Sequence, residues 1–388
     1  MRVLSLYCKD QKGGFSKRLY RLLEALVANG HELYYLSADR TSVLSEKVTH
    51  KTIRAPFQKS GNIIFWICFS IASFVHTLAV ARKHKIERIT VFSPFYTFLT
   101  LLPILLLKVP AVTFIRADNM KHSGNRLRNS IFYLFDYIGI RASMKIVFAG
   151  QSLARTYRKR FPIGNKSVLI FPNSIDRKFA VDEESRTRLR AQLAVAPEEF
   201  LLSTSGNINR GKNFGFLIEA IHRLPPDTVK LLIIGDESHP AGELQRLKQL
   251  TSERGLHERV LFCGWQPDPR LYIAASDLFV FPSRYEGSPN ALLEALSCGV
   301  PCLGSKIEEI REILLYDELL FSLERPDELV TKIKRAQSEN PYYRRLFELS
   351  EVRREHFTGD WDSKAITIVT GEQGKSAVVA FADKVRHR

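Results

Sequence analysis

The sequence has 388 residues, 45% of them hydrophobic and 25% charged, which excludes a chain too polar to fold and favours two globular domains. Residues 1–180 hold 29 Lys and Arg against 9 Asp and Glu, whereas residues 181–388 hold 28 against 32, so the net charge of +16 lies entirely in the first half. The net of +20 there indicates a polyanionic partner, either nucleic acid or an anionic membrane, with generic solubility charge as the alternative.

The chain begins with a strand pattern, a helix pattern and a second strand pattern. The run "RVLSLY" at 2–7 predicts a buried strand, and Lys9-Asp10 interrupts its apolar run too early for a secretory signal. Gly13-Gly14 opens a segment whose leucines recur three and four residues apart, which predicts a helix ending at Asn29-Gly30. Because "HELYYLSA" at 31–38 again resembles a strand, this opening predicts a βαβ unit.

Two apolar segments bear on membrane contact. Residues 63–81 are nearly long enough to span a bilayer, but His76 and several Ser and Thr residues dilute them. The segment 92–115 is broken by three prolines and by Lys108. We therefore predict at 63–81 an apolar helix that packs partly in the core and partly on a membrane interface, with "ARKHK" at 81–85 facing anionic headgroups. A transmembrane helix at 63–81 is the alternative.

The strand and helix alternation continues through both halves of the chain. Further strands are predicted at 88–93, 111–117, 145–150 and 167–173. Acidic residues appear at 181–200, where we predict a surface linker helix, and we place the domain boundary near 175–185. The second half repeats the pattern, with strands at 200–206, 229–236, 259–264, 278–283 and 300–305 and helices at 213–224 and 241–255. The pattern predicts two successive α/β domains with open sheets.

The cysteines indicate neither a disulfide framework nor a zinc site. Their number is odd, and their spacing fits neither pattern. They are predicted to be buried cytosolic thiols: Cys8, Cys68, Cys263, Cys298 and Cys302.

The most informative stretch is "RYEGSPNALLEALSCGVP" at 284–301, which follows the predicted strand 278–283. Ser288 is predicted to cap a helix that has Pro289 at its first position and runs from about 290 to 298. The amino end of that helix favours phosphate, and Glu286 and Glu294 place hydrogen-bond acceptors on both sides of it. This arrangement fits a nucleotide sugar at the carboxyl edge of an open sheet. The alternative is a helix cap with a surface acid.

A second candidate is "SGNINRGKNFGFLIEA" at 205–220, where Arg210 and Lys212 precede a helix. Cations at the end of a strand suit a diphosphate that leaves with negative charge. A solvated basic turn is the alternative.

Two weaker candidates lie in the first half. Gly13 and Gly14 would let backbone amides approach a phosphate, although the sequence lacks the G-x-x-x-x-G-K-[ST] pattern of P-loop nucleotide hydrolases. In "FIRADNMKHSGNR" at 114–126, Arg116, Asp118 and His122 follow a predicted strand, and Asp118 is a candidate proton acceptor. A plain tight turn and a charged loop are the respective alternatives.

Four stretches of the sequence, in this order, resemble the retaining glycosyltransferases of family four, which have the GT-B fold. They are "KGGFSKRLYRLLEALVANGHEL", "FPNSIDRKF" at 171–179, "GNINRGKN" and "FPSRYEGSPNALLEALSCGVP". The resemblance implies two Rossmann-like domains facing a cleft. We assign 1–178 to an acceptor-binding domain, 179–358 to a nucleotide-sugar-binding domain, and 359–388 to a helix that returns to the first domain and a basic tail.

The resemblance also implies roles for individual residues. Glu286 would bind the donor sugar, Glu294 the ribose, and Lys212 the leaving diphosphate. The donor-binding residues implied are Gly13, Gly14, Gly206, Asn207, Gly287, Ser288, Pro289, Asn290 and Glu294. We predict Glu286, Lys212, Arg210 and Asp118 as catalytic residues, and expect neither a cofactor nor a metal. The family pattern has an arginine at Asn207, for which Arg210 would substitute. A route in which the leaving phosphate takes the acceptor proton needs no protein base.

The predicted function is transfer, with retention of configuration, from a nucleotide diphosphate sugar to a lipid-linked or other glycan hydroxyl. Cell-surface polysaccharide, lipopolysaccharide or capsule synthesis is the expected setting. The expected location is cytoplasmic and peripheral, at the inner face of the plasma membrane, and nucleic acid is not expected as a partner. The alternatives are a nucleotide-sugar epimerase of the same fold and a basic membrane- or nucleic-acid-binding module without catalysis.

Overall fold

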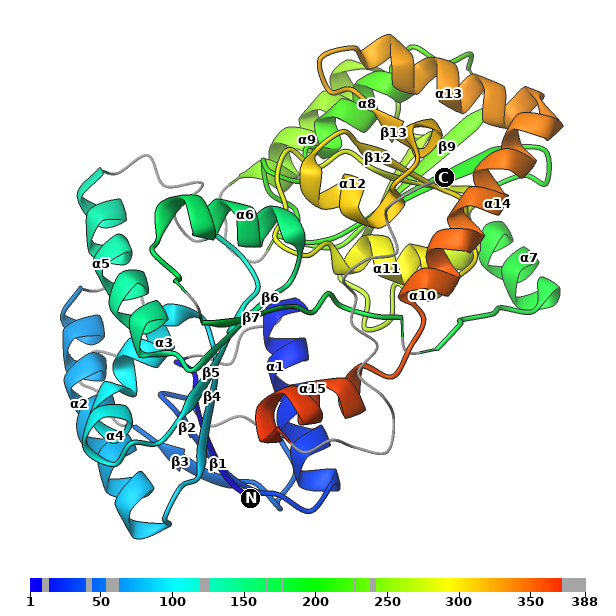
Figure 1. The fold of residues 1–388 in the computed structure, drawn as a ribbon. Coiled ribbons are helices and arrows are strands. Elements are labelled where there is room, and N and C mark those ends of the chain that lie inside the picture. Colours follow the sequence, from blue (N-terminus) through cyan, green and yellow to red (C-terminus); the bar gives the residue numbers. More distant parts are fainter. Residues whose placement is uncertain are drawn as a thin grey trace. The chain divides into compact units, whose positions relative to one another are not determined.

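The computed structural model describes residues 1–8, 14–39, 44–53, 63–118, 126–164, 166–175, 177–226, 228–237 and 242–371. The chain forms two compact α/β units (Figure 1). The first unit consists of Met1–Pro172 with Asp360–Arg388, and the second of Asn173–Gly359. The division falls after Pro172, slightly before the boundary predicted from composition.

The first unit is built on a seven-stranded parallel sheet in the order β3-β2-β1-β4-β5-β6-β7. The strands are β1 (Arg2–Leu6), β2 (Glu32–Ser37), β3 (Thr49–Thr52), β4 (Arg88–Phe92), β5 (Ala111–Ile115), β6 (Lys145–Phe148) and β7 (Ser167–Ile170). The central strands are apolar runs that are buried on both faces, as a parallel sheet covered by helices requires. The order reverses at β1, so β1 and β4 form a switch point.

Helices cover both faces of this sheet (Figure 1). They are α1 (Gly14–Ala28), α2 (Ile63–Lys83), α3 (Pro94–Leu99), α4 (Leu101–Leu106), α5 (Arg126–Ala142), α6 (Gln151–Arg160) and α15 (Trp361–Thr370). Helices α1 and α15 pack together on one face, while α2 to α5 lie on the other. Asp360 caps α15 by accepting a 3.0 Å hydrogen bond from the backbone N–H of Ser363. The Trp361 ring stacks on Phe171, so the last described helix belongs to the first unit.

The second unit has a six-stranded parallel sheet in the order β10-β9-β8-β11-β12-β13. The strands are β8 (Phe200–Ser205), β9 (Val229–Ile234), β10 (Val260–Gly264), β11 (Leu278–Phe281), β12 (Cys302–Ser305) and β13 (Leu320–Phe321). This is the strand order of a doubly wound dinucleotide-binding fold, with the switch point between β8 and β11. Both units therefore confirm the predicted α/β class.

The helices of the second unit are α7 (Glu183–Gln192), α8 (Phe214–His222), α9 (Glu243–Glu253), α10 (Arg270–Ala274), α11 (Asn290–Ser297), α12 (Glu308–Leu314), η1 (Asp317–Leu319), α13 (Pro326–Ser338) and α14 (Asn340–Phe357). The two chain crossings between the units run side by side, since the backbone N–H of Ile175 donates to the carbonyl of Phe357 and its carbonyl accepts from Gly359.

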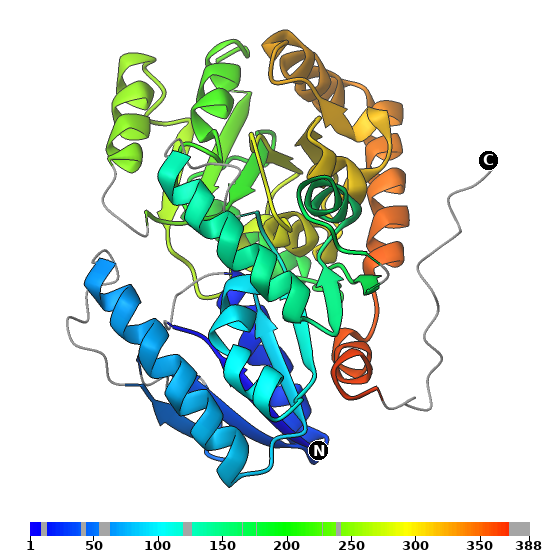
Figure 2. The same cartoon turned by 60° about the vertical axis from the view of Figure 1, so that its left-hand side comes forward.

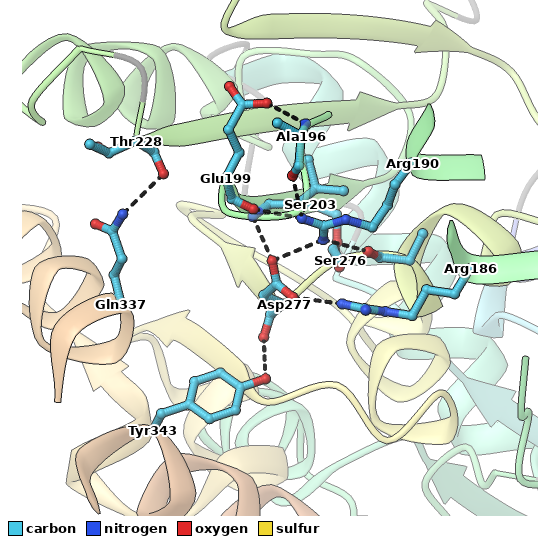
Figure 3. A network of polar contacts seen from close by, with 12 residues as sticks. Arg186, Arg190, Ala196, Glu199, Ser203, Thr228, Ser276, Asp277, Gln337 and Tyr343 are labelled. Carbon is cyan, nitrogen blue, oxygen red and sulfur yellow. Dashed lines mark hydrogen bonds and ion pairs between the residues drawn. The ribbon is translucent and has the colours of Figure 1, made fainter. Parts of the chain in front are cut away.

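An ionic cluster fastens α7 and α14 to the sheet of the second unit (Figure 3). The carboxylate of Asp277, just before β11, accepts hydrogen bonds from Arg186 at 2.7 Å and Arg190 at 3.0 Å, and from the backbone N–H of Leu201 at 2.7 Å. Its carbonyl accepts from the Tyr343 hydroxyl at 3.0 Å. The cluster lies where β8 and β11 begin, so it holds the scaffold at the edge opposite to their carboxyl ends.

All five cysteines are free thiols, with Cys8 and Cys302 buried and the others half-buried. Burial raises the pKa of Cys263 to about 11 and that of Cys298 to about 12, so both are protonated at neutral pH. Among the residues that the structure describes, His, Cys, Asp and Glu side chains form no group of three or more suited to a metal ion.

Candidate functional site

The predicted residues of the second unit gather at the switch point of its sheet. The loop after β8 carries Lys212, and the loop after neighbouring β11 carries Glu286. The Nζ atom of Lys212 donates to Oε1 of Glu286 at 2.7 Å, and the side chains are 19% and 9% exposed. Nζ also lies 4.9 Å from the centre of the Phe281 ring. In this low-exposure setting, the Coulomb attraction between the two groups is screened less than on an open surface.

Local hydrogen bonds fix the loop that presents Lys212. The side-chain oxygen of Asn209 accepts from the backbone N–H groups of Gly211 at 2.9 Å and Lys212 at 3.2 Å, which closes a tight turn before α8. The backbone N–H of Arg284 donates to the carbonyl of Gly211 at 2.8 Å and ties this loop to the one after β11. The ion pair is therefore preorganised by backbone contacts between two strand ends.

Two glycines permit this close approach of chains. A Cβ atom at Gly211 would stand 2.5 Å from Cζ of Tyr285, on the loop after β11. Gly235, which follows β9, has φ +139°, and a Cβ there would collide with the carbonyl oxygen of Gly206 after β8. Glycine is therefore required at position 235, where the carboxyl ends of β8 and β9 converge, while a larger residue at position 211 would displace the Tyr285 ring.

The amino end of α11 differs from its prediction. The helix begins at Asn290 with Pro289 as its N-cap, and no side chain caps it. The prediction that Ser288 caps the helix is wrong, because its hydroxyl instead accepts a 2.8 Å hydrogen bond from the Asn173 side chain. The same Asn173 amide donates to Oδ1 of Asn290. The uncapped end retains its partial positive charge beside Gly287, the next residue after Glu286.

Glu294 lies on α11 after its first turn and is half-buried. Its carbonyl accepts a 2.6 Å hydrogen bond from the Ser297 hydroxyl. Glu286 and Glu294 are thus carried by one loop and helix, with the helix start between them. This local order agrees with the prediction for the two acids.

Arg210 does not join Lys212. Its side chain is 88% exposed, and its Nε atom lies 3.9 Å from the carboxylate of Glu243 at the start of α9. Glu243 is buried and already accepts two hydrogen bonds from Arg246, at 2.9 and 2.7 Å. Arg210 is therefore directed toward α9, whereas Asn207 is exposed after the end of β8.

In the first unit, Gly14 begins α1, while Gly13 and His122 lie outside the described residues. Asp118, after β5, is buried and accepts two hydrogen bonds from Arg160, at 2.8 and 2.9 Å. The hydrogen bonds with Asp118 raise the pKa of Arg160. A carboxylate held by a bidentate guanidinium is a weakened proton acceptor, because protonation would break the ion pair.

Arg116 has a structural contact. It is buried, and it donates to the carbonyl of Phe171 at 2.8 Å. Burial, together with the nearby charge of Arg18, lowers the pKa of Arg116 to about 9. The guanidinium thereby connects the end of β5 to the segment that leaves β7.

Sequence reasoning overlooked two features near these residues. Asp136 in α5 is buried, and its carboxylate accepts a 3.1 Å hydrogen bond from the Tyr157 hydroxyl. A single acid within the apolar run "IFYLFDYIGI" was the available signal. Asn173 belongs to the motif "FPNSIDRKF", and nothing in that motif indicates a contact with residues 288 and 290.

Comparisons with known proteins cover both units. Residues 12–179 match the family model described as Glycosyltransferase Family 4, and residues 199–339 match the one described as Glycosyl transferases group 1. The fold is also that of solved glycosyltransferases. Anabaena HepE in complex with UDP and glucose aligns with a TM-score of 0.76 and 17% identity, over 95% of this chain and 97% of HepE. WaaG, a glycosyltransferase involved in lipopolysaccharide biosynthesis, aligns with a TM-score of 0.74 and 18% identity, over 96% and 100%.

Curated relatives match over shorter stretches. The serotype-specific mannosyltransferase WbdA of Escherichia coli is 27% identical over 222 residues, covering 55% of this chain and 27% of WbdA. The N-acetylgalactosamine-N,N'-diacetylbacillosaminyl-diphospho-undecaprenol 4-alpha-N-acetylgalactosaminyltransferase of Campylobacter jejuni is 36% identical over 142 residues, covering 36% of this chain and 37% of that enzyme. The chain thus spans about a quarter to two-fifths of the length of these two relatives.

Proposed function

Because the chain belongs to the group 1 glycosyltransferases of family four and has their GT-B class of fold, we propose that it transfers a sugar from a nucleotide diphosphate sugar to a hydroxyl group. The observation that carries the proposal is the half-buried Lys212–Glu286 pair at the switch point between β8 and β11, beside the uncapped start of α11. Ligands of open α/β sheets bind at this place.

The donor occupies the second unit in this proposal. The diphosphate faces the amino end of α11 and the ammonium of Lys212, which together stabilise its charge as it leaves. Glu286 accepts a hydrogen bond from a hydroxyl of the donor sugar, and Glu294 accepts from the ribose. Gly206, Gly287 and Asn290 line the site, while the exposed Arg210 reaches the diphosphate only by leaving Glu243.

The transfer retains configuration. The bond from the anomeric carbon to the phosphate oxygen breaks, and the acceptor oxygen bonds to the same face of that carbon. The acceptor proton passes to the departing phosphate oxygen, so the step balances without a protein base. The bidentate Arg160 contact of Asp118 supports this route over one in which Asp118 takes the proton.

We propose that the reaction needs no metal, since Lys212 and the dipole of α11 supply positive charge at the diphosphate. Transfer is then unchanged in a chelating buffer. A loss of transfer in that buffer, restored by a divalent cation, would contradict the proposal.

The proposed acceptor is a lipid-linked glycan used in cell-surface polysaccharide or lipopolysaccharide synthesis. The names of two curated relatives support this choice, because they specify diphospho-undecaprenol acceptors. The basic first half supports a peripheral position at the inner face of the plasma membrane.

A screen of nucleotide sugars tests the function. We expect one of UDP-, GDP- or ADP-sugars to raise the melting temperature and to be consumed when an acceptor is supplied, with E286A and E294A abolishing the shift. The UDP complexes of HepE make UDP-sugars the first choice. If no donor stabilises the protein and both variants behave as the parent, the function is wrong. Conversion of the donor sugar without an acceptor would indicate the epimerase.

A further inference from the structure

Helix α2 of the first unit has an unusual distribution of polarity. Its inward side carries Phe65 and Phe69, which are 2% and 0% exposed, followed by Ser73 and Thr77, which are also buried. Its outward side carries Ile64, Ile67, Ile71 and Val75, which are 47%, 53%, 61% and 60% exposed. The outward residues are spaced three, four and four apart, so they form one stripe on the helix. A water-facing helix normally has the opposite arrangement, with polar residues outside.

Neighbouring α4 also carries exposed apolar residues. Leu105 and Leu106, at the end of α4, are 62% and 60% exposed, and α4 packs beside α2. Figure 2 shows α2 as the long blue helix on the outside of the first unit. We call Ile64, Ile67, Ile71, Val75, Leu105 and Leu106 the apolar face. Large apolar side chains exposed on two helices that pack together are typical of a binding or membrane-contact site.

Exposed cations stand at the ends of this face, and acids are rare around it. Arg82, Lys83 and Lys85 are exposed at the carboxyl end of α2, and Lys108 is exposed directly after α4. Glu87 is the one acidic residue between positions 63 and 110, and it pairs with Arg2. Apolar residues flanked by Lys and Arg complement a bilayer whose surface is anionic.

The helix α2 is long and apolar enough to cross a membrane by composition. Its packing favours a different position, because Phe65 and Phe69 belong to the same core as β1 and β4. A helix surrounded by lipid could not keep this inner side in the protein core. The observed packing therefore suits a helix that lies in the plane of the membrane interface, with one side in protein and one in lipid.

We propose that the apolar face inserts into the interfacial region of an anionic bilayer, with α2 parallel to the membrane surface and with Arg82, Lys83, Lys85 and Lys108 on the headgroups. The inference goes beyond the proposed function by assigning the membrane contact and its geometry, and it rests on that function only for the peripheral location. A second copy of the chain is a poorer occupant, because its identical cations would meet these with the same charge.

The sheet topology places one end of the apolar face near the edge where an acceptor would bind. In a parallel sheet the connecting helices run antiparallel to the strands, so the amino end of α2, after β3, lies toward the carboxyl edge of the sheet. Ile64 and Ile67 are therefore the part of the apolar face nearest to the edge where ligands of such sheets bind. A lipid-linked acceptor would reach that edge without leaving the membrane surface.

Flotation of the full-length protein with vesicles of phosphatidylcholine and phosphatidylglycerol tests the proposal without any sugar donor. We expect the parent to float and I67D/I71D to lose at least tenfold in binding, with unchanged melting temperature because both residues are on the surface. The matched control is V352D, which alters an exposed aliphatic residue on α14 of the second unit and is expected to float as the parent does. Flotation of I67D/I71D equal to that of the parent overturns the proposal.

The cations are tested separately. R82Q/K83Q/K85Q is expected to bind anionic vesicles roughly fivefold more weakly for each cation removed, and this loss should vanish at high salt.

The depth of α2 is tested by fluorescence. Brominated acyl chains should quench the fluorescence of Trp66 on α2 in the parent, whereas W66F should show no quenching. Resistance to alkaline carbonate extraction would overturn the in-plane geometry in favour of a spanning helix, and a dimer that I67D/I71D converts to a monomer would show a second copy as the occupant. Donor-induced thermal stabilisation that persists in I67D/I71D separates failure of this surface from failure of the transferase function.

Discussion

The Nζ atom of Lys212 lies 2.7 Å from Oε1 of Glu286, and the two residues come from loops that follow the neighbouring strands β8 and β11. Both side chains are largely shielded from solvent, so each neutralises a charge that would otherwise be half-buried without a partner. Because the two side chains stabilise each other, we expect that the effects of substituting them on the free energy of unfolding do not add.

We expect K212M to lower kcat by roughly a hundredfold or more, because positive charge at the leaving diphosphate is lost in the transition state. It should also lower the free energy of unfolding by about 3 kcal/mol, since Glu286 is left without its cation. In the double variant K212M/E286Q, stability should recover by about 1 kcal/mol or more relative to the sum of the single changes. Urea unfolding of all four proteins measures this coupling, and strict additivity would refute it.

Asn173 is expected to hold in place the loop between Glu286 and α11, which binds the donor in the proposed function. N173A removes the hydrogen bonds to Ser288 and Asn290, so the loop between Glu286 and α11 loses a fixed point. We expect KM for the donor to rise about tenfold with a smaller change in kcat, because ground-state and transition-state binding weaken together. The control is N29A, which loses only a 2.9 Å hydrogen bond to Ala25 at the end of α1. Equal kinetics of N173A and N29A would show that Asn173 has no such role.

Stability should depend on Asp136 as the pH changes. Burial raises the pKa of Asp136 to about 7, despite the opposing effect of the Tyr157 hydrogen bond, and the charges facing it are those of Asp118 and Arg160. The folded protein therefore keeps Asp136 protonated over a range in which the unfolded chain ionises it. Protonated Asp136 makes its full contribution to the free energy of unfolding below about pH 4. As the pH rises to about 7, the free energy of unfolding falls by on the order of 2–4 kcal/mol.

The measurement is the difference in unfolding free energy between the parent and D136N at several pH values. The neutral amide cannot ionise, so D136N should gain on the parent between pH 4 and 7. Other groups titrate equally in both proteins and cancel in the difference. A difference that does not vary with pH over this interval would mean that Asp136 is not buried as a titrating acid.

Two arginines of α7 should differ sharply in their importance. Arg190 is buried and donates to Asp277 and to the carbonyls of Ala275, Ala196 and Glu199, whereas Arg188 forms an exposed pair with Glu184. We expect R190A to lower the free energy of unfolding by about 3–5 kcal/mol and R188A by less than about 0.5 kcal/mol. Chemical denaturation compares them, and activity of folded R190A should be nearly normal, because the cluster lies at the edge opposite to Lys212.

Most strands, and the position of Lys212 and Glu286 at neighbouring strand ends, could be predicted from local sequence patterns. The buried runs of β9 and β11 are mainly apolar because helices cover both faces of the sheet. The glycines in the loop after β8 allow chains to approach closely, so both requirements are visible in the residues. The same patterns did not reveal β3, whose residues Thr49–Thr52 are mostly exposed at a sheet edge and therefore lack an apolar run. Residues 9–13, directly before α1, lie outside the described residues, so the role of Gly13 stays a prediction.

The remaining site features depend on contacts between distant residues. Asn173 and Ser288 are 115 positions apart. Serine is a residue type that commonly caps helices, so Ser288 by itself suggested a cap. An aspartate such as Asp118 can act as a base, but Arg160 on α6 donates hydrogen bonds to its carboxylate in the folded unit. Arg210 likewise carries the charge expected at a diphosphate but lies near Glu243. A local pattern supplies the type of side chain, whereas its partner is decided by the tertiary fold.

The return of the chain in α15 sets an order on folding during synthesis. The second unit is an uninterrupted segment, Asn173–Gly359, and can acquire all its contacts as soon as that segment has left the ribosome. The first unit is translated first but still lacks Trp361, whose ring stacks on Phe171, and the Asp362 carboxylate that accepts from Arg21 at 2.6 Å. The earliest part of the chain therefore waits for its last described helix, and the second unit is the first to be completed.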